Sequence, residues 1–208
     1  MTQHSRRRFL QTGIAASVLP LGLGGWRLEG GPVGRPSSDA EPPGLPLYKV
    51  LFDQRFPPSV TFANAAAAFG ARTAAFEADI TDIWFGDLSL RWGQGPVPVA
   101  GLTAHGPLFC LERWGWDHGL RVIYRTRHER LEDGRIEHTI HGPRTVVRCV
   151  SEALNTGDSW ARQVARPMTS CPPGETESIT DHVITPGDSD IDPDEPLFSW
   201  VIAPYRRR

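Results

Sequence analysis

The chain has 208 residues, of which 39% are hydrophobic and 22% are charged, as expected for one globular domain with short appendages. Its formal net charge of −2 argues against a nucleic-acid-binding protein, which would normally carry a basic face. Residues 47–208 are expected to form a single domain. A leader (1–30) and a linker rich in Gly, Pro and Ser (31–46) precede it.

The leader contains a basic pattern followed by a weakly apolar run. Arg6 and Arg7 are followed, after one residue, by Phe9 and Leu10. The run 12–26 is too short and too rich in glycine for a good membrane span. The segment SRRRFLQ resembles the twin-arginine (Tat) export signal, and the resemblance implies that the Tat translocation machinery exports the folded protein to the periplasm.

Two questions about export stay open at this level. The sequence shows no clean Ala-x-Ala cleavage site, so the leader is either removed or retained as a membrane anchor. Proteins that take this route bind a cofactor first, fold too fast for the unfolded-chain route, or travel with a partner. A periplasmic partner subunit is therefore one expectation, and no cofactor is identified.

The chain has three cysteines, and an oxidising compartment permits a disulfide between two of them. Cys149 and Cys171 are the favoured pair, because Cys110 falls on the apolar side of a predicted helix. There is no Cys-x-x-Cys pattern, which argues against a zinc ribbon, a thioredoxin-like redox pair and a c-type haem.

Three strand–helix units are predicted in the first part of the domain. Short apolar runs indicate buried strands, and Ala-rich or amphipathic segments indicate the helices. The strands are expected over 47–52, 72–78 and 97–102, and the helices over 62–69, 79–92 and from Pro107. Helices at 145–154 and 159–165 and strands at 179–185 and 197–203 complete the chain.

A β-hairpin is predicted over 120–131 and 135–141, because Asp133 and Gly134 suit a two-residue turn. This turn would place His128 opposite Thr139 and bring His128 and His141 onto one strand face as a diagonal pair. Such a pair is either part of a metal site or simply a solvated strand face.

The alternation of strands and helices predicts an α/β fold. The simplest topology is a flavodoxin-like three-layer sandwich with a mainly parallel sheet, extended at one edge by the antiparallel hairpin.

Polar side chains follow each of the first three predicted strands. Ligands in open α/β sheets bind beyond the carboxyl ends of the strands, so a ligand cleft is expected there. The alternative is that these residues cap helices or pair with each other. The cleft candidates are Asp53 and Arg55 after the first strand, Asp79, Thr81 and Asp82 after the second, and Thr103 and His105 after the third.

Familiar catalytic patterns are missing from the domain. The sequence contains no Gly-x-Ser-x-Gly nucleophile elbow, no Gly-x-Gly-x-x-Gly after the first strand and no Walker lysine. The leading interpretation is an exported ligand-binding protein or an accessory subunit of a redox or substrate-processing complex. One alternative is a small hydrolase or transferase in which His105 acts as general base beside Asp53 or Asp79. A metal-binding protein that uses His128 and His141 is a further alternative.

Overall fold

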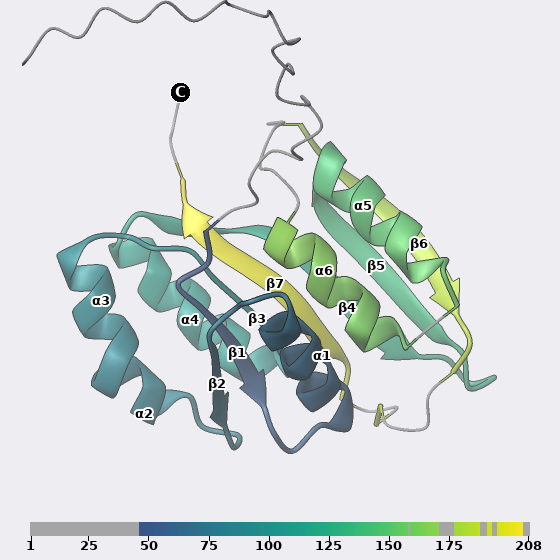
Figure 1. Cartoon of the computed structure of the whole chain (residues 1–208), viewed down its shortest axis with the longest axis horizontal. Coiled ribbons are helices and arrows are strands. Elements are labelled where there is room, and N and C mark those ends of the chain that lie inside the picture. The colour runs from purple at the N-terminus through teal and green to yellow at the C-terminus, as the bar shows by residue number, and fades with distance from the viewer. Residues whose placement is uncertain (1–45, 158, 171–176, 188–190, 193–194, 206–208) are drawn as a thin grey trace, which may run out of the picture. The chain divides into compact units, whose positions relative to one another are not determined.

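A computed structural model describes residues 46–157, 159–170, 177–187, 191–192 and 195–205, which belong to one compact unit, Glu41–Arg208. Figure 1 shows a seven-stranded sheet in the order β2-β1-β3-β7-β4-β5-β6. Its strands are β1 (Lys49–Asp53), β2 (Thr73–Phe76), β3 (Val99–Thr103), β4 (Leu120–Arg130), β5 (Ile136–Pro143), β6 (Ser178–Thr185) and β7 (Leu197–Pro204). The helical segments are α1 (Pro57–Ala68), α2 (Thr81–Ile83), η1 (Trp84–Leu88), α3 (Ser89–Gln94), α4 (His105–Asp117), α5 (Arg144–Leu154) and α6 (Trp160–Ser170).

The α/β class is confirmed, but the prediction of a mainly parallel sheet is wrong. β1 pairs in parallel with β2 and β3, whereas β7 pairs antiparallel with both β3 and β4. β4 therefore runs in the same direction as the first three strands, as the strand–helix alternation predicts. The difference is the C-terminal strand, which inserts between β3 and β4.

The composition of β7 explains its central position. Every residue of β7 before Pro204 is buried. Trp200 and Ile202 belong to one apolar cluster, which includes Leu108 and Leu111 of α4, and Leu197 and Val201 belong to the cluster on the other face. A strand that is apolar on both sides is stable only where both faces of the sheet are covered.

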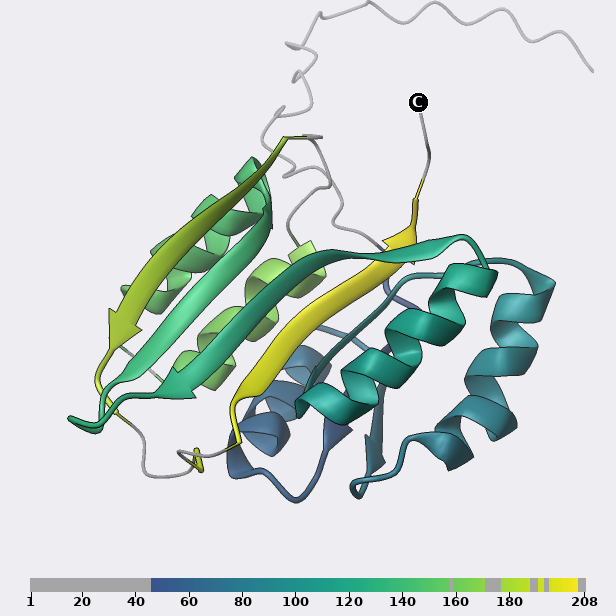
Figure 2. The same cartoon turned by 180° about the vertical axis from the view of Figure 1, so that it is seen from behind.

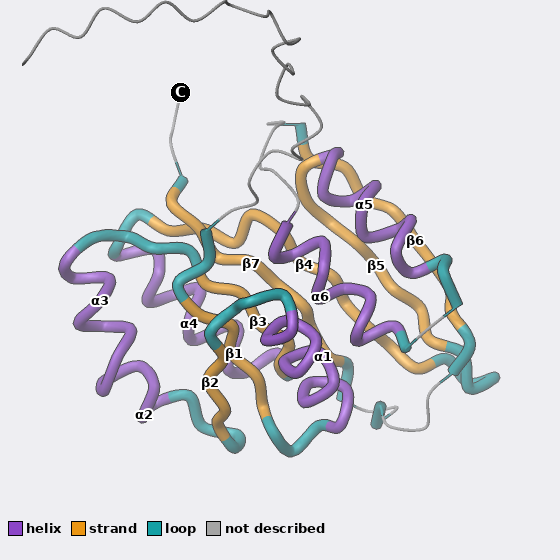
Figure 3. The backbone as a smooth tube through the Cα atoms, in the orientation of Figure 1, coloured by secondary structure: helices purple, strands orange, loops and turns teal. Residues whose placement is uncertain are grey.

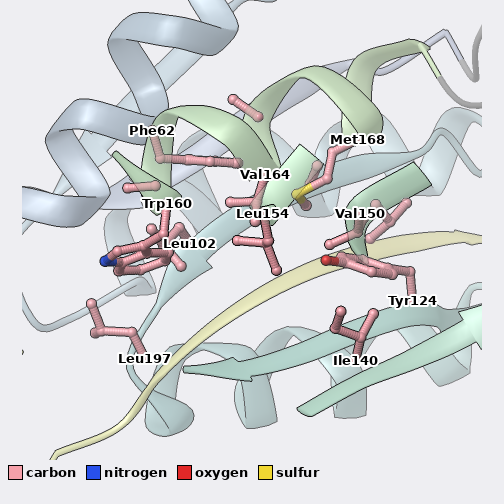
Figure 4. Close-up of a cluster of buried hydrophobic side chains, with 14 of the residues drawn as sticks. Phe62, Leu102, Tyr124, Ile140, Val150, Leu154, Trp160, Val164, Met168 and Leu197 are labelled. Atoms are coloured by element: carbon pink, nitrogen blue, oxygen red, sulfur yellow. The ribbon is translucent and has the colours of Figure 1, made fainter. Parts of the chain in front are cut away.

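Helices cover the two faces of the sheet unequally. α1, α6 and α5 lie along one face (Figures 1 and 3). On the other face, α4 packs against β7 and the first part of β4, and the segment α2–η1–α3 lies beside α4, toward β1 and β2 (Figure 2). No described helix lies over that second face of β5, β6 and the part of β4 after Arg125 (Figure 2). The larger apolar cluster lies between the first group of helices and the sheet, and it includes Val150, Leu154, Val164 and Ile140 (Figure 4).

The hairpin between β4 and β5 forms, but in a different register from the predicted one. His128 lies opposite His138, and Leu131 N–H donates to the Arg135 carbonyl, which closes a three-residue turn. Gly134 takes a positive φ of 83°, as the last residue of such a turn requires. A shift of one residue in a strand pair moves side chains to the opposite face. The predicted pairing of His128 with Thr139 is therefore wrong.

The segment predicted as one helix over 79–92 is broken into three pieces. α2 is a single turn, η1 is a π-helical turn and α3 completes the segment. The Ser89 N–H bonds to the carbonyl of Trp84, five residues earlier, which defines the π turn. Among the described helices, none has the length and apolar content needed to cross a membrane.

Candidate functional site

The carboxyl ends of β1 and β3 lie side by side, as the strand pattern predicts. The register pairs Phe52 with Leu102, so the next residues, Asp53 and Thr103, are level with each other on neighbouring strands. Both side chains are completely buried. A buried polar group needs an internal partner, and those partners determine whether the groups are available to a ligand.

Asp53 forms an ion pair with Arg55. Arg55 Nη2 donates to Asp53 Oδ2 at 2.7 Å, and Arg55 Nε donates to Asp53 Oδ1 at 3.0 Å. The backbone N–H of Arg55 also donates to Oδ1, at 3.1 Å. The hydrogen bonds to the Asp53 carboxylate raise the pKa of the Arg55 guanidinium above its usual value. The negative charges of Glu195 and Glu77 add smaller contributions in the same direction. The pair therefore closes the turn after β1, and both carboxylate oxygens are occupied.

Two of the candidates after the second strand, Asp79 and Thr81, are bonded to each other. Asp79 is exposed and accepts hydrogen bonds from both the hydroxyl and the backbone N–H of Thr81, which lower the pKa of its carboxyl. Asp82 is exposed in the first turn of α2. Asp79 and Thr81 thus form a turn that leads into α2.

At the third strand end, Thr103 and His105 serve different purposes. The Thr103 hydroxyl donates to the Ala104 carbonyl and accepts from the Trp200 indole N–H at 3.1 Å. His105 is exposed, and its ring contacts Phe198 with the centroids 5.6 Å apart. Among the described residues, no hydrogen bond or ion pair links His105 to Asp53 or to Asp79. The structure therefore places the candidates at one edge of the sheet without assembling an acid–base pair.

A polar chain that the sequence does not reveal is buried beneath α6. His128 Nδ1 and His138 Nδ1 are 2.6 Å apart, and Trp160 covers the His128 ring with the centroids 4.3 Å apart. Figure 4 shows Trp160 between α6 and the sheet. The shift of hairpin register brings the two imidazoles together. The buried chain, taken in order of contact, comprises Thr126, Tyr124, Ser199, His128, His138 and Thr185.

Both imidazoles of this chain are neutral near pH 7. Burial, reinforced by the neighbouring His138, holds the pKa of His128 well below its usual value. Burial also lowers the pKa of His138, to about 4. One set of tautomers satisfies every contact without a charge: Ser199 donates to His128 Nε2, His128 Nδ1–H donates to His138, and His138 Nε2–H donates to Thr185. The chain is thus a structural network.

The sheet surface without a described helix is polar, and we call it the open face. It carries two ion pairs: Arg125 with Glu112 of α4 at 2.8 Å, and Arg127 with Glu129 at 2.7 Å. His141 Nδ1 lies 3.0 Å from the Thr180 hydroxyl. The alternation along the three strands defines the open face as Arg125, Arg127, Glu129, Glu137, Thr139, His141, Thr180, His182 and Ile184.

The predicted metal pair is not assembled. His141 lies opposite Arg125 on the open face, whereas His128 is completely buried on the covered face. The part of the chain that the structure describes holds no group of three or more His, Cys, Asp or Glu side chains arranged to bind a metal ion. Cys171, the predicted partner of Cys149, and the leader residues Arg6, Arg7, Phe9 and Leu10 lie outside the described residues, so the disulfide and the export signal stay predictions.

We compared the chain with protein-family models, with curated proteins and with solved structures, and none of them matches. Any functional conclusion therefore rests on the chain's own residues.

Proposed function

We propose that this protein is an exported, non-catalytic accessory subunit that binds a partner protein in the periplasm through the open face. The observation that carries the proposal is the unequal covering of the sheet. β5, β6 and the second half of β4 present a continuous, mostly polar set of side chains with no described helix over them (Figure 2). Export rests on the resemblance of residues 5–11 to a twin-arginine signal.

The composition of the open face suits a protein partner. Its cations and carboxylates are largely paired within the face, as in the Arg127–Glu129 ion pair, so no single sign of charge dominates. Exposed apolar side chains lie within it and on the neighbouring helix: Ile184 of β6 is 48% exposed, and Phe109 of α4 is 52% exposed. Protein interfaces commonly combine such apolar anchors with arginine and hydrogen-bonding side chains.

The strand-end candidates support the non-catalytic part of the proposal. Both oxygens of Asp53 accept hydrogen bonds from Arg55, and the Thr103 hydroxyl is engaged with Trp200. A general base must lie within hydrogen-bond reach of the proton that it removes and must be free to accept it. Of the exposed candidates, Asp82 lies in the first turn of α2, and no described carboxylate is hydrogen-bonded to His105.

Site-specific photo-crosslinking in the exporting cell tests the proposal. A photoreactive residue at Thr139 is expected to capture one defined partner, whereas the same residue at Glu152, exposed on α5, serves as the matched control. Replacing both Arg6 and Arg7 with lysine is expected to retain the chain in the cytoplasm and to abolish the crosslink. Equal labelling from Thr139 and Glu152, or a monomeric protein without any crosslink, would refute the accessory role.

A further inference from the structure

A cluster of charged side chains lies at the end of the sheet opposite to the carboxyl ends of the parallel strands. Tyr48 and Lys49 stand at the start of β1, and both donate hydrogen bonds to Asp87 of η1. The Tyr48 hydroxyl lies 2.6 Å from Asp87 Oδ1. The Lys49 ammonium and the Asp87 carboxylate keep 17% and 26% of their side chains exposed, so solvent reaches the cluster.

Two arginines add positive charge to this place. The Arg91 guanidinium lies over the Tyr48 ring, 5.6 Å from the centroid, and the Lys49 ammonium lies 5.2 Å from the same centroid. Arg72, exposed just before β2, is level with Lys49, because parallel pairing places Val50 beside Thr73 and the Val50 N–H donates to the Arg72 carbonyl. We call Tyr48, Lys49, Arg72, Asp87 and Arg91 the Lys49 cluster. The cluster contains three cations and one carboxylate, which leaves an excess of two positive charges; one Arg91 nitrogen, Nη1, also donates to the Gly95 carbonyl at 3.3 Å.

The protonation states of Asp87 and Tyr48 agree with an excess of two positive charges in the cluster. Burial acts to raise the pKa of Asp87, but the hydrogen bonds from Lys49 and Tyr48 outweigh it and lower that pKa. The hydrogen bond to Asp87 raises the pKa of the Tyr48 phenol, which therefore stays protonated and can donate. The cluster thus contains one carboxylate, one neutral phenol and three cations at neutral pH.

The backbone that carries Asp87 is itself unusual. Asp87 lies in the π-helical turn, between the buried side chains of Trp84 and Leu88. π turns are less favourable than regular α-helix, and within helices they occur frequently at functional sites. The irregular turn and the concentration of cations are independent observations about the same place.

We propose that the Lys49 cluster binds a phosphate group, either as the free ion or as the monoester end of a larger molecule. Arg72 and Arg91 supply planar guanidinium groups that match phosphate oxygens, and Lys49 and Tyr48 supply further donors. A phosphate dianion balances the two excess positive charges. This site is separate from the open face, and it does not depend on the proposed accessory role.

Lys49 is the only lysine in the sequence, which gives the experiment a specific signal. Full-length protein labelled with ¹⁵N-lysine should show one side-chain ammonium resonance. Titration with inorganic phosphate and, separately, with glycerol 3-phosphate is carried out at constant ionic strength with chloride as the balancing anion, because salt screens exposed charges. We expect a saturable shift of the Lys49 resonance, and the ligand that saturates at lower concentration distinguishes the free ion from the monoester.

Variants of the cluster separate binding from a purely structural ion pair. Arg72→Gln and Arg91→Gln should each weaken binding about tenfold, the size expected for one charge-assisted hydrogen bond. Arg148→Gln, which removes an exposed arginine of α5, is the matched control and should change nothing. Asp87→Asn should tighten binding several-fold, because it removes the competing negative charge. A Lys49 resonance that responds equally to chloride, or that does not respond to either phosphate, overturns the proposal.

Discussion

Polar side chains are buried in one half of the sheet and exposed on one face of the other half. In the parallel half, β2-β1-β3, helices lie on both faces, and the polar side chains Asp53 and Thr103 are buried with internal partners. In the antiparallel half, β4-β5-β6, one face is covered and the other displays Arg127, His141 and His182 to solvent. The side chains available to a partner are therefore displayed where a layer of helices is absent, and those at the strand ends are largely taken up by internal contacts.

The histidines show the same contrast within one half of the sheet. His128 and His138 lie on the covered face of β4 and β5, and His141 and His182 lie exposed on the open face of β5 and β6. The same side chain is thus a neutral component of the interior on one face and a solvated group on the other. Burial, rather than the strand itself, determines which role each imidazole takes.

The first prediction concerns the acid stability of the covered face. An unfolded histidine binds a proton near pH 6.5, whereas folded His138 does so at about 4. Between these values the unfolded state binds more protons, so stability is full above pH 6.5 and is lost as the pH falls. His138 alone should remove about 2 kcal/mol between pH 6.5 and 5, and His128 should add to this loss. Urea unfolding as a function of pH measures the loss.

Variants attribute this pH dependence to the buried pair. His138→Gln should flatten the slope of unfolding free energy against pH, even if it lowers stability at every pH. His141→Gln, which removes an exposed imidazole of the open face, is the matched control. Equal slopes for both variants and the parent protein would show that the buried pair is not the source.

The second prediction tests the packing of the fully covered half. A Cβ at Gly101 of β3 would lie 2.5 Å from Trp200 Cζ2 and 2.6 Å from the Leu51 carbonyl oxygen. Neither atom can move freely, because Trp200 is completely buried and the carbonyl belongs to the sheet backbone. Gly101→Ala should therefore destabilise the protein by about 3 kcal/mol, measured by urea unfolding. A loss below about 0.5 kcal/mol would contradict the close packing of Trp200 and Leu51 against Gly101.

Features of the fold that depend on neighbouring residues could be predicted from the sequence, whereas features that depend on contacts between distant residues could not. The strand at 120–131 and the helix at 145–154 follow local patterns, and the structure has them as β4 (Leu120–Arg130) and α5 (Arg144–Leu154). The apolar run 197–203 predicts a strand, but its pairing with β3 is set by contacts about a hundred residues away, as between Trp200 and Thr103. Local patterns carry no information about such pairing, and the prediction of a mainly parallel sheet failed there.

The candidate site was predictable only in part for a similar reason. The position of Asp53 and Thr103 at neighbouring strand ends follows from the alternation of strands and helices. The hydrogen bonds of Asp53 with Arg55 and of Thr103 with Trp200 do not follow from that alternation. The buried His128–His138 contact depends on one residue of hairpin register, and Asp133-Gly134 is compatible with a two-residue and with a three-residue turn.

The third prediction compares two arginine–carboxylate pairs, one from each half. Asp53 is completely buried and Arg55 keeps 43% of its side chain exposed, whereas Arg127 and Glu129 are 46% and 31% exposed. Removing Arg55 leaves a buried carboxylate without its charged partner, so Arg55→Ala should cost about 2 kcal/mol, a value reduced for the exposure of Arg55. Arg127→Ala should cost less than about 0.5 kcal/mol. Similar losses for the two variants, measured by urea unfolding, would contradict the contrast between buried and exposed pairs.

The smallest expected change in stability should accompany the largest change in binding. Thr139 lies on β5 between Arg127 of β4 and His182 of β6, near the centre of the open face. Thr139→Ala should shift the free energy of unfolding by no more than about 0.5 kcal/mol, since no buried contact is removed. Thr139→Arg should be similarly tolerated, but its long charged side chain should obstruct a partner and strongly reduce co-purification of the crosslinked protein. A partner retained by Thr139→Arg but lost on an equivalent Glu152→Arg change would move the docking surface from the open face to α5.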